Sequence, residues 1–221
     1  MKDIETSPRR VFIVDDHPIV RQGLGELINH EPDLKVCGEA AGVEEARIRL
    51  SQTEPDVVIV DLSLRDSDGF ELIKDIRAMY QQLPVLVLSM HDESVYAERL
   101  LSAGANGYIM KQAAADQLLV ALRRVLGGGI YVSEHVGTSM IERFSAHGPR
   151  QSASPVERLS TRELQVLNLI GNGKATREIA EGLGLSVKTV ESHRQRIKKK
   201  LNLTTSPQLV QFAVNWLSQQ H

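Results

Sequence analysis

The sequence has 221 residues, which is room for one large domain or two small ones. Its hydrophobic content of 42% and charged content of 24% are ordinary for a globular protein, and it lacks the run of about 18 apolar residues that a membrane span needs. The net charge of −2 hides an asymmetry: residues from 145 onward hold 11 basic and 5 acidic side chains, whereas the first 144 hold 15 and 23. A basic C-terminal part indicates a polyanionic partner for that part.

The single cysteine excludes an internal disulfide and a cysteine-based metal cluster. The N-terminal segment MKDIETSPRR has no apolar core and does not resemble a signal peptide. These features predict a cytoplasmic protein with no membrane association.

Short runs rich in Val and Ile alternate with amphipathic stretches through the first half of the chain. The runs predict strands at 11–14, 35–39, 57–60, 85–88 and 107–110, and the stretches predict helices near 18–29, 43–52, 69–80, 93–103 and 113–126. Strands that are nearly all apolar are typical of parallel sheets covered on both faces. The pattern therefore predicts an α/β domain with a doubly wound, five-stranded parallel sheet.

Three glycines at 127–129 end the fifth predicted helix, and a further short helix is predicted near 133–144. The segment SAHGPRQSASPVE has little to bury and is interpreted as a linker. After it the pattern is wholly helical, with helices at 161–171, 175–182, 187–201 and 206–219. The predicted organisation is the α/β domain at 1–130, a connecting helix and flexible linker at 131–157, and an all-α domain of four helices at 158–221.

Polar side chains follow four of the five predicted strands. Asp15 and Asp16 end the first strand, Asp61 the third and Ser89 the fourth, and Lys111 follows the fifth. The carboxyl ends of parallel strands share one edge, where ligands of open α/β sheets bind. Close carboxylates repel one another and need a cation, and hard oxygen ligands suit Mg²⁺.

A carboxylate beside Mg²⁺ can attack a phosphoryl group and form an aspartyl phosphate. Asp61 lies on the middle strand of the inferred order and is the predicted acceptor, with Asp15 and Asp16 holding the metal. Lys111 would neutralise a phosphoryl oxygen, and the Ser89 hydroxyl would donate to another. Taken singly, each residue also has an ordinary explanation as a solvated loop carboxylate, a helix cap or a surface lysine.

The segments VFIVDDHPIVRQGL, VVIVDLSLRDSDGFEL, VLVLSMHDE and AGANGYIMK resemble the signature blocks of a response-regulator receiver domain, over residues 9 to 130. The resemblance implies a flavodoxin-like fold, a sensor histidine kinase as partner, and phosphorylation of Asp61. It also implies that the main-chain carbonyl of Ser63 binds the metal and that Tyr108 is the switch aromatic; from the residues alone, Tyr108 could simply be a packed strand aromatic.

One position departs from the receiver pattern. Such domains usually carry proline four residues after the phosphoacceptor, and here that residue is Arg65. This departure puts the lifetime of the phosphoryl group in doubt, but not the acceptor. Ser63 and His91 are expected where their side chains obstruct or admit attacking water.

The C-terminal sequence has the order of signals expected for a helix-turn-helix. Ser160 and Glu163 form a predicted capping box, Gly184 permits a tight turn, and Ser186 caps the third helix. The apolar positions of that third helix repeat on one face, at Val190, His193, Ile197 and Leu201. The opposite face mixes polar and cationic side chains, as a helix that enters a DNA groove requires, although a solvated basic face would look similar.

The motif LSTRELQVL…EIAEGLGLS…TVESHRQRIKKKL resembles the LuxR-type helix-turn-helix of the NarL/FixJ subfamily, over residues 157 to 220. The resemblance implies double-stranded DNA as partner, read or held by Lys188, Thr189, Glu191, Ser192, Gln195, Arg196 and Lys199. In relatives the last helix pairs DNA-binding domains, which implies a homodimer on activation through Leu209, Phe212, Ala213 and Trp216. Packing of that helix on its own domain is the alternative.

The whole sequence therefore predicts a response regulator and transcription factor whose DNA binding and dimerisation are controlled by phosphorylation of Asp61. It is not expected to be an enzyme beyond its own phosphorylation and dephosphorylation. One alternative is a phosphorylation-independent DNA-binding regulator that uses the receiver for dimerisation. Another is a phosphatase, but the two aspartates separated by one residue in haloacid dehalogenases are absent, since Asp15 and Asp16 are adjacent.

Overall fold

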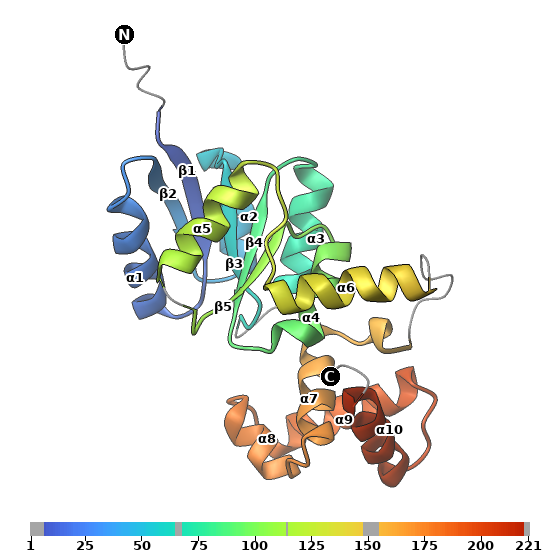
Figure 1. The fold of residues 1–221 in the computed structure, drawn as a ribbon. Helices are drawn as coiled ribbons and strands as arrows, with labels where there is room; N and C mark the ends of the chain where they lie inside the picture. Colours follow the sequence, from blue (N-terminus) through green and yellow to red (C-terminus); the bar gives the residue numbers. More distant parts are fainter. Residues whose placement is uncertain (1–6, 65–67, 114, 148–154, 219–221) are drawn as a thin grey trace. The chain divides into compact units, whose positions relative to one another are not determined.

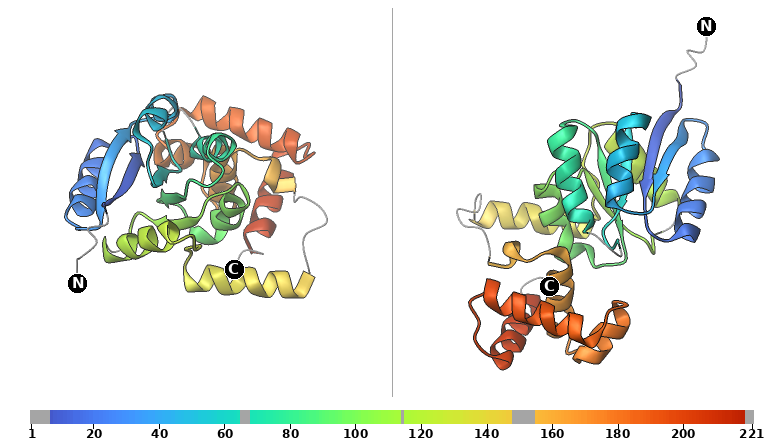
Figure 2. Two further views of the ribbon diagram at one scale, coloured as in Figure 1. Left: turned by 90° about the horizontal axis from the view of Figure 1, so that it is seen from above. Right: turned by 180° about the vertical axis from the view of Figure 1, so that it is seen from behind.

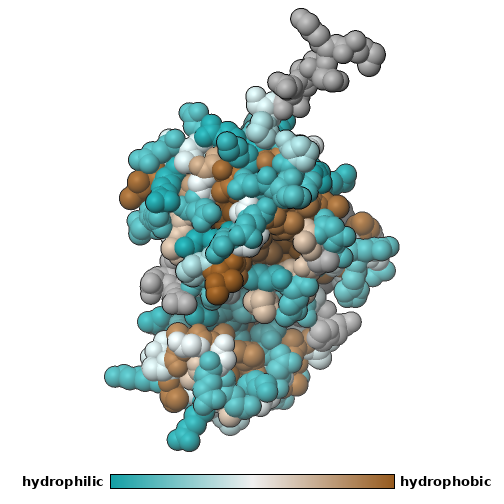
Figure 3. Space-filling view, turned by 90° about the vertical axis from the view of Figure 1, so that its left-hand side faces the viewer, coloured by the Kyte–Doolittle hydropathy of each residue, from teal (hydrophilic) through white to brown (hydrophobic). Residues whose placement is uncertain are grey.

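The computed structural model describes residues 7–64, 68–113, 115–147 and 155–218 and divides into two compact units, Met1–Ser145 and Ala146–His221. Within those described ranges, no helix combines the length and the apolar character needed to cross a membrane. Figure 3 shows one face of the molecule, where hydrophilic residues predominate and hydrophobic residues form smaller patches.

The first unit is built on a five-stranded sheet whose neighbouring strands all pair in parallel (Figure 1). The strand order is β2-β1-β3-β4-β5, which places β3 in the middle, as predicted for the strand that ends in Asp61. This order is the flavodoxin-like one. The strands are β1 (Arg9–Val14), β2 (Leu34–Ala40), β3 (Val57–Asp61), β4 (Val85–Ser89) and β5 (Gly107–Met110).

Helices cover both faces of this sheet. Figures 1 and 2 show α1 and α5 on one face and α2, α3 and α4 on the other. The side chains of β3 and β4 are buried throughout because both faces are covered, so these strands carry uninterrupted apolar runs. The predicted fold class is therefore confirmed. The helices are α1 (Pro18–Asn29), α2 (Val43–Thr53), α3 (Gly69–Met79), α4 (Glu93–Ser102) and α5 (Ala115–Leu126).

The chain returns to the sheet after α5. The backbone N–H of Tyr108 in β5 donates to the carbonyl of Tyr131 at 2.8 Å, and the N–H of Ser133 donates to Glu93 Oε1 in α4 at 2.7 Å. Glu93 is buried, so this hydrogen bond satisfies a carboxylate that would otherwise be costly to remove from water. The start of α6 (Glu134–His147) is therefore attached to β5 and α4.

The second unit is wholly helical in its described residues, as predicted. A short 3-10 helix, η1 (Pro155–Arg158), begins inside the segment expected to be a linker and ends one residue beyond it. It is followed by α7 (Thr161–Gly171), α8 (Thr176–Gly182), α9 (Val187–Lys200) and α10 (Ser206–Ser218).

Local signals explain where these helices begin. Ser160 Oγ accepts from the N–H of Glu163, whose carboxylate accepts from the N–H of Ser160 at 2.7 Å, so the predicted capping box is confirmed. Gly184 adopts a φ of +63° in the turn before α9, a conformation that glycine reaches without a steric penalty. Ser186 Oγ then caps α9 by accepting from the N–H of Thr189 at 3.0 Å.

Candidate functional site

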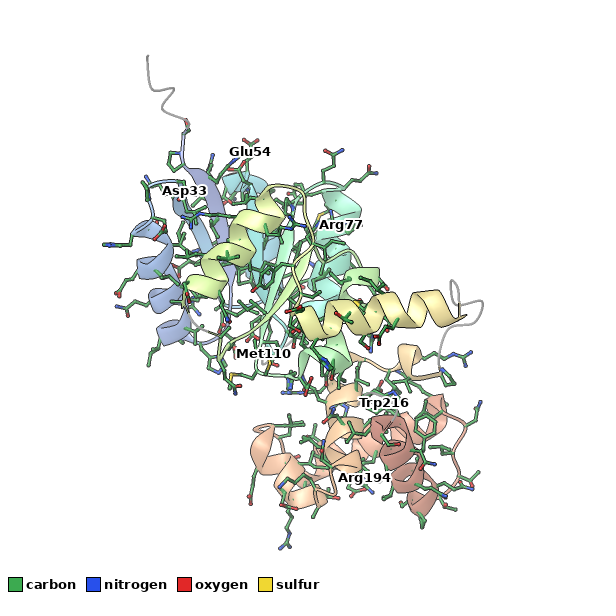
Figure 4. All side chains as sticks on the ribbon, viewed as in Figure 1. Asp33, Glu54, Arg77, Met110, Arg194 and Trp216 are labelled. Carbon is green, nitrogen blue, oxygen red and sulfur yellow. The ribbon has the colours of Figure 1, made fainter. Side chains whose placement is uncertain are left out.

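The predicted acidic site lies at the carboxyl edge of the sheet. In Figure 4, Met110 marks this edge, and Asp33 and Glu54 mark the opposite one. Asp15 and Asp61 are each 1% exposed and Ser89 is 0% exposed, so three of the predicted polar groups are buried. Buried carboxylates of this kind are rare unless they are paired or bind a cation.

Lys111 joins the two buried carboxylates. Its Nζ lies 2.6 Å from Asp15 Oδ2 and 2.9 Å from Asp61 Oδ2, and its backbone N–H donates to the Ser89 carbonyl at 2.7 Å. Burial lowers the pKa of Lys111, but its ion pairs with Asp15 and Asp61 outweigh this effect and leave the pKa raised. The lysine is therefore held in its charged form between the ends of β1, β3 and β4.

Asp61 makes one hydrogen bond and one ion pair in the site. Its Oδ1 accepts from the backbone N–H of Ser63 at 3.0 Å, while its Oδ2 faces Lys111. Burial raises the pKa of Asp61, and the nearby charge of Lys111 acts in the opposite direction. A carboxylate with one hydrogen bond and one ion pair in a buried site keeps unshared electron pairs for bonding to another group.

His17 lies beside the acidic pair, a position that was not predicted from the sequence. Its Nδ1 lies 2.8 Å from Asp16 Oδ1 and 3.1 Å from Asp15 Oδ1, and its backbone N–H donates to Asp15 Oδ1 at 2.8 Å. Ligand atoms of Asp15, Asp16, His17 and Asp61 all lie within 4.8 Å of one another. The only signal in the sequence was the position of His17 directly after the two aspartates.

This donor set fits a divalent cation. Three carboxylates supply the hard, charged oxygens that Mg²⁺ prefers, and their mutual repulsion would be relieved by a positive ion. The acidic cluster can therefore hold a metal ion.

The predicted switch residues meet at His91. Ser89 Oγ accepts from the His91 N–H at 3.1 Å, and the Tyr108 hydroxyl donates to the His91 carbonyl at 2.8 Å. Ser63 Oγ lies 2.8 Å from His91 Nε2, which links the segments after β3 and β4. Tyr108 is 1% exposed, and burial raises the pKa of its hydroxyl. Arg65, the departure from the receiver pattern, lies outside the described residues.

The inner face of α9 carries the predicted apolar residues, since Val190, Ile197 and Leu201 are buried. His193 is half-buried, and its Nδ1 has no hydrogen-bond partner among the described residues. Burial, together with the charge of Arg196, lowers the pKa of His193. Its neutral ring is suited to this packed face, where a positive charge would be poorly solvated.

The opposite face of α9 is open to solvent. Six of the predicted DNA-contacting residues are exposed, namely Lys188, Glu191, Ser192, Gln195, Arg196 and Lys199. Thr189 is only half-exposed, because it lies beside the cap formed by Ser186. Glu191 Oε1 accepts from the Thr176 hydroxyl of α8 at 3.2 Å, which fixes the glutamate relative to the turn.

The last helix packs against its own unit. Leu209 and Ala213 are 0% exposed, and α10 packs on α7 so closely that a Cβ on Gly171 would lie 2.8 Å from the Ala213 carbonyl oxygen. Leu209 and Ala213 are therefore covered by their own unit, whereas the contact of α10 with a second copy stays a prediction. Phe212 and Trp216 are half-buried, and Figure 4 labels Trp216 on α10.

A five-stranded parallel sheet with buried aspartates and a lysine at its carboxyl edge, joined to a helix-turn-helix, defines a DNA-binding response regulator. Two family models match the chain: "response regulator receiver domain" over residues 11–123 and "bacterial regulatory proteins, luxR family" over residues 157–213. The chain belongs to the LuxR-type response regulators, a family in which phosphorylation controls DNA binding. Its receiver implies a sensor kinase as partner.

Similar proteins span nearly the whole chain. The Oxygen regulatory protein NreC of Staphylococcus aureus is 37% identical over 209 residues, which cover 93% of this chain and 96% of that protein. RcsB of Salmonella enterica serovar Typhimurium, solved on the promoter rprA with the phosphomimetic BeF3⁻, is 29% identical with a TM-score of 0.58, covering 94% of this chain and 99% of that one. Another structure holds two RcsB dimers bound to two parallel DNAs. It is 29% identical with a TM-score of 0.57, covering 93% of this chain and 98% of that one.

Proposed function

We propose that this response regulator takes its phosphoryl group on Asp61. The observation that carries the proposal is Lys111 Nζ, held 2.9 Å from Asp61 Oδ2 and 2.6 Å from Asp15 Oδ2. An Asp61 oxygen attacks the phosphorus, and the bond from phosphorus to the donor's leaving group breaks with its electron pair going to that group. Lys111 and the Ser89 hydroxyl then contact the non-bridging oxygens.

Asp15, Asp16, Asp61 and the main-chain carbonyl of Ser63 are the proposed metal-binding groups. Mg²⁺ bound there would neutralise the negative charge that accumulates between the carboxylates and the phosphoryl oxygens. The proposed covalent chemistry is confined to gain and loss of the protein's own phosphoryl group, so the chain is not expected to turn over another substrate.

We propose that the structural effect of phosphorylation at Asp61 reaches the surface through His91. The Ser89 oxygen accepts from the His91 N–H, so movement of the Ser89 hydroxyl toward a phosphoryl oxygen, to which it would donate, would lengthen this hydrogen bond. Tyr108 is tied to the His91 carbonyl by its hydroxyl and to Tyr131 by its backbone. A rearrangement at Ser89 can therefore reach the start of α6 through hydrogen bonds within one unit.

Lys188, Thr189, Glu191, Ser192, Gln195, Arg196 and Lys199 are the proposed DNA contacts on α9. The exposed short polar side chains suit base edges, and the cations suit phosphates. We propose residues 1–130 as the receiver domain, 131–157 as the connecting helix and linker, and 158–221 as the DNA-binding domain, in a cytoplasmic protein.

The proposal is tested by measuring DNA affinity with and without beryllofluoride, a phosphate mimic, in the presence of Mg²⁺. Fluorescence anisotropy with a promoter fragment should show affinity rising at least about tenfold with the mimic, which corresponds to about 1.4 kcal/mol of coupling. Equal affinities would favour a regulator whose DNA binding does not depend on phosphorylation.

Replacing Lys199 with alanine should weaken DNA binding and flatten its dependence on salt. Loss of one phosphate contact releases one counterion fewer, so the slope of log affinity against log salt should fall by about 0.9. The matched control is Lys35→Ala, an exposed lysine of β2 in the other unit. An unchanged slope in Lys199→Ala would remove this residue from the proposed phosphate contacts.

Replacing Trp216 with lysine should weaken dimerisation by about tenfold or more if α10 pairs two copies, because an apolar contact would then hold an unpaired charge. Gln211→Lys is the control on an exposed position of the same helix. Sedimentation equilibrium with beryllofluoride measures both variants. Equal dimerisation constants for Trp216→Lys and Gln211→Lys would place the dimer interface outside the Trp216 face of α10.

A further inference from the structure

The imidazole of His17 occupies a position next to the metal-binding carboxylates. Its Nδ1 lies 2.8 Å from Asp16 Oδ1 and 3.1 Å from Asp15 Oδ1, and it belongs to the same group of ligand atoms as Asp61. The His17 backbone N–H donates to Asp15 Oδ1, and the Arg21 guanidinium donates to the Asp15 carbonyl at 2.6 Å. The main chain that carries the ring is therefore fixed to the acidic pair.

These separations match the geometry of neighbouring ligands on a metal ion. An octahedral ion with bonds of about 2.1 Å places adjacent ligand atoms about 3 Å apart. The two Nδ1 to carboxylate distances of 2.8 and 3.1 Å lie on either side of that value. The same distances allow Nδ1–H to donate to the carboxylates, so a metal ion shared by Nδ1 and both carboxylates would displace that hydrogen and leave the neutral ring protonated on Nε2.

We propose that His17 Nδ1 is a metal ligand and makes this site favour first-row transition divalent ions over Mg²⁺. Carboxylates alone suit Mg²⁺, whereas an imidazole nitrogen binds Mn²⁺, Co²⁺ or Zn²⁺ better and contributes little to Mg²⁺ binding. The inference rests on the proposed function, because it assigns the metal selectivity of the same acidic site.

Pulsed electron paramagnetic resonance of Mn²⁺ bound to the full chain tests the proposal directly. The wild-type protein should show the hyperfine coupling of a directly bound imidazole nitrogen. His17→Ala should lose it, and His17→Asn, which offers an oxygen ligand in place of the ring, should keep Mn²⁺ but lose the imidazole coupling. His30→Ala, an exposed histidine at the other end of α1, should retain the coupling.

Metal affinities measured by calorimetry give a second readout. The wild type should bind Co²⁺ about tenfold or more tightly than Mg²⁺, and His17→Asn should lower Co²⁺ affinity by about tenfold or more while changing Mg²⁺ affinity less than about threefold.

Two results would overturn the role of His17 and leave the proposed function intact. One is Mn²⁺ bound to the wild type without nitrogen coupling, and the other is coupling that persists in His17→Ala, which would assign it to another imidazole such as His91. Failure of the wild type to bind either Mg²⁺ or Mn²⁺ would instead contradict the proposed metal site itself, and the His17 inference with it.

Discussion

Asp61→Asn is expected to abolish labelling of the protein by acetyl phosphate and Mg²⁺. The amide that replaces the carboxylate is a poor nucleophile and cannot form an acyl phosphate, and Asp15, the other carboxylate that contacts Lys111, has both oxygens engaged. Asp15 Oδ2 is occupied by Lys111 at 2.6 Å, and Asp15 Oδ1 accepts from the His17 N–H. The measurement is the mass of the intact protein before and after incubation with acetyl phosphate.

The control is Asp116→Asn, an exposed aspartate at the start of α5 outside the site. It should be labelled as the wild type is. In a DNA-binding assay with acetyl phosphate, Asp61→Asn should show the affinity of the unphosphorylated protein. Phosphate that remains bound to Asp61→Asn would move the acceptor to a different residue.

Loss of labelling in Asp61→Asn should not arise from unfolding. Burial raises the pKa of Asp61, so the folded protein binds this proton more tightly than the unfolded chain does. Stability from such a group is present at low pH and is lost as the pH rises through the raised folded pKa. At neutral pH the ionised carboxylate is therefore unfavourable, and the neutral amide should leave thermal stability equal or higher, as a melting curve at pH 7 would detect.

The elements that carry the acidic site could be predicted from the sequence because their signals are local. Apolar runs predict the buried strands, and the residue after each run lies at the carboxyl edge of a parallel sheet. Asp15, Asp61 and Lys111 meet there for that reason. The contact of Lys111 with both carboxylates, however, depends on strand order, which local patterns alone do not determine.

Other features depend on which elements pack against each other in the folded chain. The periodicity of apolar residues does not determine this packing. The apolar residues of α10 were identified from the sequence. Their spacing could not show that α7 covers Leu209 and Ala213. The attachment of Tyr131 and Ser133 to β5 and α4 joins residues distant in sequence. His17 was missed because its place in the site depends on the orientation of the ring, which residue spacing does not fix.

Gly69→Ala is expected to displace the backbone around Asp61 at the end of β3. Gly69 is the buried first residue of α3, and a Cβ there would lie 2.4 Å from the Asp61 carbonyl oxygen and 2.9 Å from the Leu62 Cα. Both neighbours are backbone atoms, so no side-chain rotation relieves the overlap. Either α3 or the end of β3 must move, and overpacking of this kind costs about 1 to 3 kcal/mol of stability.

Displacement of Asp61 should also slow its phosphorylation, by up to about 100-fold for a shift near 1 Å. Labelling rates with acetyl phosphate and urea unfolding curves separate the two effects, since the rate is measured where the variant is fully folded. Gly23→Ala is the matched control: nothing lies within 4 Å of its added Cβ on α1, and alanine there should be stabilising by about 0.5 to 1 kcal/mol. A Gly69→Ala protein with wild-type stability and labelling rate would mean that the segment after β3 adapts freely, and that the close approach of α3 does not position Asp61.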